Sequence, residues 1–155
     1  MRVQDVMNTP AITCHVNDTL QTAAVLMWDH DCGVIAVIND DGKVTGVITD
    51  RDICMGACTQ NRPLDAILVN TAMAHSPITV TPDHKLDDVE RLMADRQIRR
   101  LPVVDASGAP LGMLSLNDLA IESVEPDTRM KNGPVKVAYT LAAICRRRSP
   151  KKKAA

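Results

Sequence analysis

Residues 33–53 read GVIAVINDDGKVTGVITDRDI, and residues 98–119 read IRRLPVVDASGAPLGMLSLNDL. Each stretch contains a branched aliphatic run, a turn with a glycine, a second apolar run, and a Thr or Ser followed three residues later by Asp. The likeness extends without a gap over residues 7–53 and 73–119. An ungapped internal match of this length indicates a tandem duplication.

Identical residues recur at corresponding positions of the two copies, and they include the turn glycines and the motif aspartates. The identical pairs are Met7/Met73, Ile12/Ile78, Thr13/Thr79, Leu20/Leu86, Met27/Met93, Asp29/Asp95, Val37/Val103, Gly42/Gly108, Gly46/Gly112 and Asp52/Asp118. A unit of roughly 50 residues buries too little apolar surface to be stable alone. We therefore expect the two copies to pack against each other and to leave a groove between them.

Hydrophobic periodicity predicts the same order of elements in each copy, β-α-β-β-α, and hence an α/β (α+β) fold with pseudo-twofold symmetry. The first helix has an apolar stripe at helical spacing and is expected to begin near Asn17 and Asp18, or at Thr81 with Pro82. The predicted strands are 12–14, 34–38 and 44–48 in the first copy, and 78–80, 101–104 and 111–114 in the second. The last helix of each copy is expected to start at Thr49 or Ser115.

These patterns divide the chain into five segments. We expect repeats at 1–60 and 73–124, joined by a linker at 61–72 that contains a short helix near 64–69. A C-terminal extension at 125–145 contains a predicted helix over 135–145, and the basic tail at 146–155 is expected to be disordered. The apolar side predicted for that helix consists of Val135, Ala138, Leu141, Ala142 and Cys145.

Composition excludes several classes of protein. Hydrophobic residues make up 45% and charged residues 24% of the chain, which is typical of a globular protein. We see no apolar run long enough to span a membrane and no secretory signal, so we expect a cytoplasmic protein. With no Phe, one Trp and one Tyr, the core must be aliphatic, and stacking of RNA or single-stranded bases is disfavoured. The acidic body with a basic tail also makes nucleic-acid binding an unfavoured function.

The quoted stretches, together with VMNTPAITCHVNDTL at 6–20 and AMAHSPITVTPDHKL at 72–86, resemble the CBS-domain family in its paired form, the Bateman module. The likeness covers residues 5–120. The chain length and the ending AYTLAAICRRR are similar to small stand-alone bacterial members, typified by the hypoxic response protein. The resemblance implies a homodimeric regulatory module. It further implies that AMP, ADP, ATP or S-adenosylmethionine binds in the cleft between the repeats. We also expect no enzymatic activity and no cofactor, because the sequence offers no Ser-His-Asp, HExxH or Cys-His arrangement and no glycine-rich phosphate loop.

Both copies contain the ligand motif of that family, a Gly, two apolar residues, a Thr or Ser, two variable residues and an Asp, at 46–52 and 112–118. The hydroxyls of Thr49 and Ser115 lie where a strand gives way to a helix, and free N–H groups and the helix dipole favour a phosphate there. Asp52 and Asp118, one turn further on, can accept hydrogen bonds from ribose hydroxyls.

Basic and aliphatic side chains complete the predicted site. We expect Arg51 in one copy, and Arg99 or Arg100 in the other, to contact the phosphate. Because the body of the chain is acidic, a mono- or diphosphate is favoured over ATP. The predicted ligand-binding residues are Ile12, Thr13, Val34, Ile35, Ala36, Thr49, Arg51, Asp52, Ile78, Thr79, Arg100, Leu101, Pro102, Ser115, Asn117 and Asp118.

Other interpretations of these residues stay open. The Thr-x-x-Asp and Ser-x-x-Asp motifs also suit a capping box that serves helix stability alone. Cys54 and Cys58 share a helix face and, with His15 or His30, define a hypothetical thiol or zinc sensor, although buried reduced thiols are the simpler interpretation. A structural adaptor whose basic tail binds nucleic acid is a third alternative. Trp28 is predicted to lie in the core or at a subunit interface.

Overall fold

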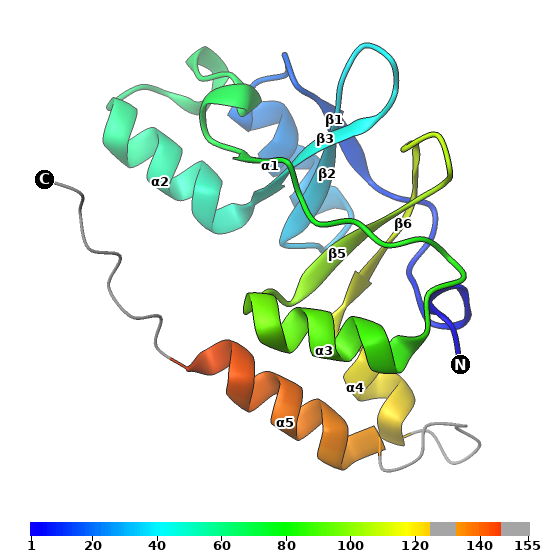
Figure 1. Ribbon diagram of the computed structural model, residues 1–155. Helices are drawn as coiled ribbons and strands as arrows, with labels where there is room; N and C mark the ends of the chain where they lie inside the picture. Colours follow the sequence, from blue (N-terminus) through cyan, green and yellow to red (C-terminus); the bar gives the residue numbers. More distant parts are fainter. Residues whose placement is uncertain (125–132, 147–155) are drawn as a thin grey trace, which may run out of the picture.

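The computed structural model describes residues 1–124 and 133–146, and it confirms a mixed α+β fold built from two similar units (Figure 1). The first unit contains β1 (Thr13–His15), α1 (Leu20–Asp29), β2 (Val34–Ile38), β3 (Val44–Thr49) and α2 (Asp50–Gln60). The second contains β4 (Ala74–His75), α3 (Leu86–Arg96), β5 (Arg100–Val104), β6 (Pro110–Ser115) and α4 (Leu116–Val124). The helix α5 (Gly133–Cys145) follows, and short 3-10 turns lie at Val3–Asp5, Leu64–Ala66 and Val69–Thr71.

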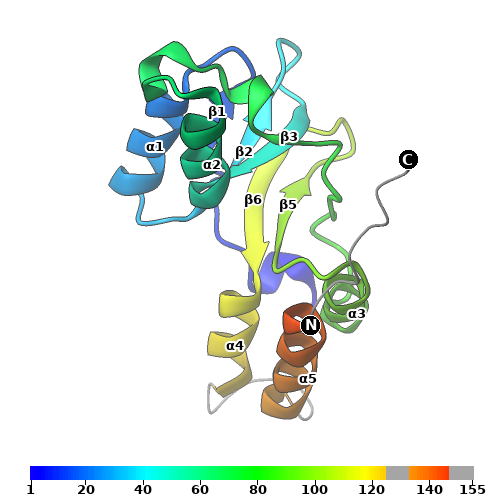
Figure 2. The same cartoon turned by 90° about the vertical axis from the view of Figure 1, so that its left-hand side faces the viewer.

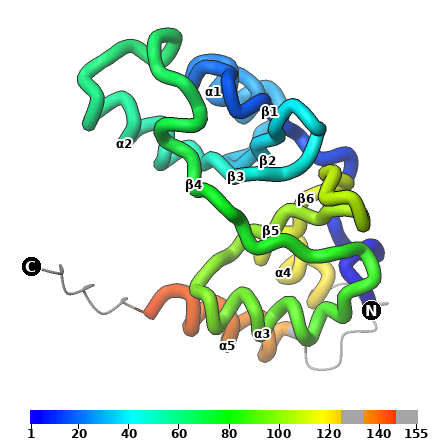
Figure 3. Tube along the Cα trace, turned by 45° about the horizontal axis from the view of Figure 1, so that its top comes forward, coloured from blue at the N-terminus to red at the C-terminus, as the bar shows by residue number. Residues whose placement is uncertain are grey.

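The two units exchange their leading segments. The first sheet has the order β1-β2-β3-β4, so that β4, at the start of the second unit, pairs antiparallel with β3 of the first. The converse pairing joins Asn8, ahead of the first unit, to Met113 in β6. Figure 3 shows the chain crossing from α2 through β4 to the other half of the molecule. Each unit therefore completes the sheet of the other, which fixes how the two units face each other.

Each unit has its own aliphatic core, as the scarcity of aromatic residues predicts. In the first core, α1 and α2 pack on the sheet around Leu20, Ile35 and Ile48, each fully buried. The second core has α3 and α4 around Met93 and Leu101. Figure 2 shows α5 lying alongside α3 and α4, at the opposite end of the molecule from α1 and α2.

Both predicted starts of the first helix in each unit are wrong by a few residues. In the first unit Thr19 is the N-cap and accepts a hydrogen bond from the backbone N–H of Thr22, while Asp18 instead accepts one from the backbone N–H of His15. In the second unit the helix begins only at Leu86, because the Thr81 hydroxyl is engaged in the preceding turn. Side chains that bond to nearby backbone stabilise turns in preference to the helix.

The strand predicted at 78–80 is shorter in the structure than the sequence indicates. It survives as an isolated parallel bridge between Val80 and Val103, supported by the hydrogen bond from the Val80 N–H to the Pro102 carbonyl. In the first unit the ladder continues through the Ala36 N–H to the Ile12 carbonyl and the Val16 N–H to the Ile38 carbonyl. Pro102 and Pro82 stand at the positions of these two donors, and because proline has no N–H, the pairing does not extend in either direction.

The predicted apolar side of the C-terminal helix is the side that α5 turns outward, which corrects the prediction. Val135 and Leu141 are exposed to 56% and 48%, and Ala138, Ala142 and Cys145 are exposed as well. The opposite side, with Val137 and Ile144, packs on the second core. Periodicity alone could not distinguish them because both sides are apolar. The tail beyond Arg146, predicted to be disordered, lies outside the described residues.

Candidate functional site in the clefts between the repeats

Both motifs form reciprocal capping boxes at a strand-to-helix junction. At the start of α2, the Thr49 hydroxyl donates to Asp52 Oδ2 over 2.7 Å, and the Asp52 backbone N–H donates back to Thr49 Oγ1 over 3.2 Å. At the start of α4, the Ser115 hydroxyl donates to Asp118 Oδ2 over 2.7 Å, and the return bond is 3.3 Å. The capping interpretation therefore holds for both motifs. It leaves one carboxylate oxygen, Oδ1, outside each box.

The first cleft lies beside the Thr49 motif and has a volume of about 390 Å³. Residues of both units and of α5 line it: Val34, Val47, Thr49, Asp50, Arg51, Gln97, Ile98, Arg99, Arg100 and Ile144. Three arginines and a single aspartate are the ionisable groups in this lining. The first cleft therefore has an excess of positive charge, which suits a phosphate.

The second cleft lies beside the Ser115 motif and is larger, about 570 Å³. Its lining residues are Asn8, Thr9, Pro10, Ile12, His30, Asp31, Cys32, Gly33, Val34, Arg100, Met113, Ser115, Asn117, Asp118 and Ile121. Two carboxylates and one arginine make it more acidic than the first cleft when its histidine is neutral. The two clefts are thus related by the repeat but differ in charge.

Arg100 and Val34 occupy corresponding positions of the two units, and each lines both clefts. An Nη1 atom of Arg100 donates to the Gly33 carbonyl over 3.4 Å, which holds the half-buried guanidinium between the units. The prediction of one arginine per copy is therefore replaced by a cluster. Arg51, Arg99 and Arg100 meet at the first cleft.

The structure distributes the other predicted residues unevenly. Ile12, Asn117 and Asp118 line the second cleft, and Thr49 and Arg51 line the first. Asp52, half-buried, lies one turn behind Thr49. Thr13 in β1, and Ile78 and Thr79 just ahead of the Val80 bridge, are half-buried and are not among the residues that line either cleft. Ile35, Ala36, Leu101 and Pro102 are buried in β2 and β5, and none of them is among the residues that line either cleft.

Sequence reasoning missed residues that reach each cleft from elsewhere. Asn8 arrives through the exchanged leading segment, and its Nδ2 donates to Asp118 Oδ1 over 2.7 Å. Gln97 and Ile144 reach the first cleft from the end of α3 and from α5. No local pattern identifies them, because their role depends on contacts between distant segments. The pairing of Asn8 with Ala74 in the internal repeat was the one available signal.

The sequence profile of the CBS domain matches this chain twice, over residues 3–56 and 69–125. The chain belongs to the CBS-domain family. Among curated relatives, this CBS-domain protein is 36% identical over 126 residues to the CBS domain-containing protein YhcV of Bacillus subtilis, covering 81% of this chain and 88% of YhcV. The outer helix α5 lies beyond the matched residues.

Solved CBS-domain structures share the fold. The CBS domain pair of protein MJ0100, in complex with 5'-methylthioadenosine and S-adenosyl-L-methionine, matches with a TM-score of 0.70 and 28% identity over 78% of this chain and 94% of that one. Hypoxic Response Protein I, with two coordinated zinc ions, matches with a TM-score of 0.70 and 24% identity over 78% of this chain and 98% of that one. The resemblance to stand-alone CBS-pair proteins is thereby confirmed.

The cysteines do not form a metal centre in the part of the chain that the structure describes, where no three His, Cys, Asp or Glu side chains are grouped for a metal ion. Cys54 and Cys58 are free and exposed on α2, which corrects the interpretation of them as buried thiols. Cys14 is buried, and the loss of hydration raises the pKa of its thiol to about 12. A thiol with so high a pKa is protonated and unreactive at neutral pH. No helix among the described residues is long and apolar enough to cross a membrane.

Proposed function

We propose that this CBS-domain protein is a regulatory module that binds an adenosine-containing ligand in the clefts between its repeats and has no catalytic activity of its own. The observation that carries the proposal is the pair of capping boxes, each of which holds a carboxylate at a helix N-terminus beside a cleft. A ribose hydroxyl can donate to the Oδ1 atom of that carboxylate without breaking the box. The MJ0100 CBS pair, which is crystallised with two adenosine derivatives, supports the ligand class.

The charges of the clefts favour different ligands. Arg51, Arg99 and Arg100 carry enough positive charge to bind one or two phosphates in the first cleft. We therefore propose that this cleft binds AMP or ADP in preference to ATP. The longer triphosphate would extend past these arginines toward an acidic body. In the second cleft Asp31 and Asp118 oppose a phosphate and suit an uncharged or cationic adenosyl compound such as S-adenosylmethionine.

Isothermal titration calorimetry of the full chain with AMP, ADP, ATP and S-adenosylmethionine tests this proposal. We expect Asp118→Ala to abolish S-adenosylmethionine binding and to leave AMP binding intact. We expect Asp52→Ala to abolish AMP binding and to leave S-adenosylmethionine binding intact. Because either change also removes a cap worth about 1 kcal/mol, thermal melts must show that the variants are folded at the titration temperature. Absence of binding heat and of any thermal shift with all four compounds would refute the proposal.

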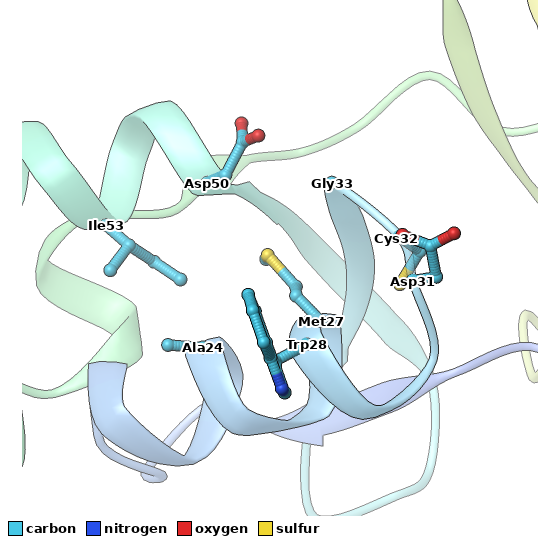
Figure 4. Close-up of a pocket in the computed structure, with 8 residues that line it drawn as sticks. All are labelled: Ala24, Met27, Trp28, Asp31, Cys32, Gly33, Asp50 and Ile53. Atoms are coloured by element: carbon cyan, nitrogen blue, oxygen red, sulfur yellow. The ribbon is translucent and has the colours of Figure 1, made fainter.

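We further propose that the protein forms a homodimer through the outer face of α1 and α2. Trp28 is 86% exposed there, so the alternative that it lies in the core is excluded, and Val25 and Met55 are about half exposed. Ala24, Met27 and Trp28 face Ile53 across a groove of about 440 Å³ (Figure 4). In the second unit α5 packs on the equivalent helix pair, whereas among the described residues α1 contacts the short turn Leu64–Ala66 and no counterpart of α5 packs on α1 and α2. Burial of so large a side chain is a strong drive to associate.

The dimer is tested by sedimentation equilibrium of the full chain and of Trp28→Glu. A charge placed at the centre of the groove should shift the protein to a monomer with an unchanged far-UV spectrum. Tyr139→Glu is the matched control, because Tyr139 is 75% exposed on α5, away from this groove. A monomeric wild-type chain at tens of micromolar, or a Trp28→Glu variant that stays dimeric, would contradict this interface.

A further inference from the structure

The C-terminal helix α5 lies outside the residues that match the CBS domain, yet it packs closely on both helices of the second unit. The structure records its contacts with α3 and with α4. Val137 and Ile144 on its inner side reach the second core. The helix is therefore an addition to the paired module that is docked on one end of it.

The C-terminal end of α5 is tied to the turn that ends α3. The side-chain amide of Gln97 donates to the carbonyl of Ala143 over 3.1 Å and to the carbonyl of Arg146 over 2.9 Å. Carbonyl groups in the last turn of a helix lack intrahelical partners, so Gln97 caps α5 from outside. Gln97 itself is held in the left-handed conformation, with φ of 51°.

The same residues form a wall of the first cleft. Gln97, Ile98 and Arg99 line it from the turn between α3 and β5, and Ile144 lines it from α5. A molecule that fills this cleft must therefore contact the end of α5 or the residue that caps it. The second cleft is bounded by Ile121 of α4 and by the leading segment, and α5 contributes nothing to its described lining.

A buried polar group beneath α5 weakens the docking of this helix on α3. Glu90 on α3 is 4% exposed beneath α5, and its Oε1 atom has no hydrogen-bond partner. Lys136 of α5 pairs with Asp87 at the rim of the same interface. Burial of an unsatisfied carboxylate offsets part of the apolar gain from docking. A helix held this way can change its docking in response to a modest amount of binding energy.

We propose that Ile144 and Gln97 belong to the first ligand site, so that occupancy of this cleft, and not of the second, controls how firmly α5 is docked. The proposal rests on the proposed function, because it assumes that an adenosine ligand binds there. The contact of the ligand with Ile144 exists only while α5 is docked, and the side chain of Gln97 is oriented by its hydrogen bonds to α5 in that state. Ligand binding and docking therefore strengthen each other to the same extent.

Hydrogen exchange of the wild-type full chain tests this coupling without a mutation. With saturating AMP, we expect the amides of residues 133–146 to exchange more slowly, together with those of β3 and the turn at Gln97. Saturating S-adenosylmethionine, which we place in the second cleft, should leave residues 133–146 unchanged. If AMP protects the first cleft but not residues 133–146, the inference is wrong while the proposed function stands. If no adenosine compound binds the wild-type chain, both are wrong.

Calorimetry of variants in an Asp118→Ala background, where only the first cleft remains, supplies an independent measurement. Loss of part of an aliphatic contact in Ile144→Ala should weaken AMP binding by about fivefold. Leu141→Ala is the matched control, because Leu141 lies on the outer side of α5, 48% exposed and away from the cleft. Equal AMP affinity for Ile144→Ala and Leu141→Ala would overturn the inference.

Discussion

Asn8 and Asp118, 110 residues apart in the chain, are joined by a hydrogen bond of 2.7 Å from Asn8 Nδ2 to Asp118 Oδ1. The bond exists because the leading segment of the first unit crosses to β6 of the second. Where β4 of the second unit pairs with β3 of the first, the residue that corresponds to Asn8 is Ala74, whose side chain has no hydrogen-bond donor. The Asp118 carboxylate of the second motif therefore accepts a hydrogen bond from a residue outside its own unit.

We expect Asn8→Ala to tighten S-adenosylmethionine binding in the second cleft by about threefold to tenfold, because the amide competes with a ribose hydroxyl for Asp118 Oδ1. Calorimetry measures the change, and AMP binding in the first cleft serves as the internal control. Weaker S-adenosylmethionine binding would show instead that Asn8 orients the carboxylate for the ligand.

Two glycines mark the places where the exchanged segments cross the sheets. A methyl group at Gly112 would meet the Asn8 carbonyl oxygen at 2.5 Å, whereas at Gly46 it would meet the flexible Met73 Sδ at 2.6 Å and the Ala74 carbonyl oxygen only at 3.0 Å. We expect Gly112→Ala to lower the free energy of unfolding by about 2–3 kcal/mol, and Gly46→Ala by about 1 kcal/mol, since backbone yields less readily than a methionine side chain. Urea denaturation measures both values. An equal cost at the two positions would contradict this account of the crossings.

Arg100 tests the recognition of phosphate. Arg100→Gln removes a positive charge that both clefts share but keeps most of the side-chain length. AMP affinity should fall by about tenfold, and adenosine affinity should stay the same, because only the phosphate interacts with the charge. Competition titrations of AMP against adenosine by calorimetry measure the ratio of the two affinities in the wild type and in the variant. A parallel loss for both would mean that Arg100 supports the fold of the cleft.

Glu90 should make the docking of α5 sensitive to pH. Burial raises the pKa of its carboxyl, Asp87 adds to the shift, and Lys136 opposes it. A raised pKa means that the folded chain binds the proton more tightly than the unfolded one, so this group destabilises the protein as pH rises from the ordinary glutamate pKa through the folded value.

Glu90→Gln should therefore increase the free energy of unfolding by about 1 kcal/mol at neutral pH, and the gain should vanish in acid. The difference between the variant and the wild type, measured by urea denaturation across pH, isolates Glu90 from the other carboxyl groups. Asp95→Asn, at an exposed position of the same helix α3, is the matched control. A difference that grows toward low pH would have the wrong sign.

The cysteines should react in an order set by burial. With a pKa of about 12, the Cys14 thiol should resist Ellman's reagent at pH 7.5 until the chain is unfolded. Cys54, Cys58 and Cys145 are exposed and should react in the native state. Mass spectrometry of labelled peptides identifies the sites. Rapid native labelling of Cys14 would contradict its burial and its raised pKa.

Much of the fold could be predicted because it depends on local patterns repeated in the chain. The paired apolar runs predict β2, β3, β5 and β6 to within a residue or two, since buried branched residues have few other local conformations. The Thr-x-x-Asp and Ser-x-x-Asp motifs locate the starts of α2 and α4, because their capping bonds span only three residues. The internal repeat also indicates two related sites.

The sequence by itself determined two copies of one unit and the caps that place Asp52 and Asp118 at the starts of α2 and α4, because those features depend on neighbours a few residues apart. Only the tertiary structure decided which side of α5 is buried, which residues line each cleft, and that Asn8 and Ile144 reach them. These follow from contacts between segments far apart in the chain, where several packings satisfy the same apolar pattern. The exchange of leading segments selects one of these packings, and the unequal charges of the two clefts come from the arginines that line the first and the aspartates that line the second.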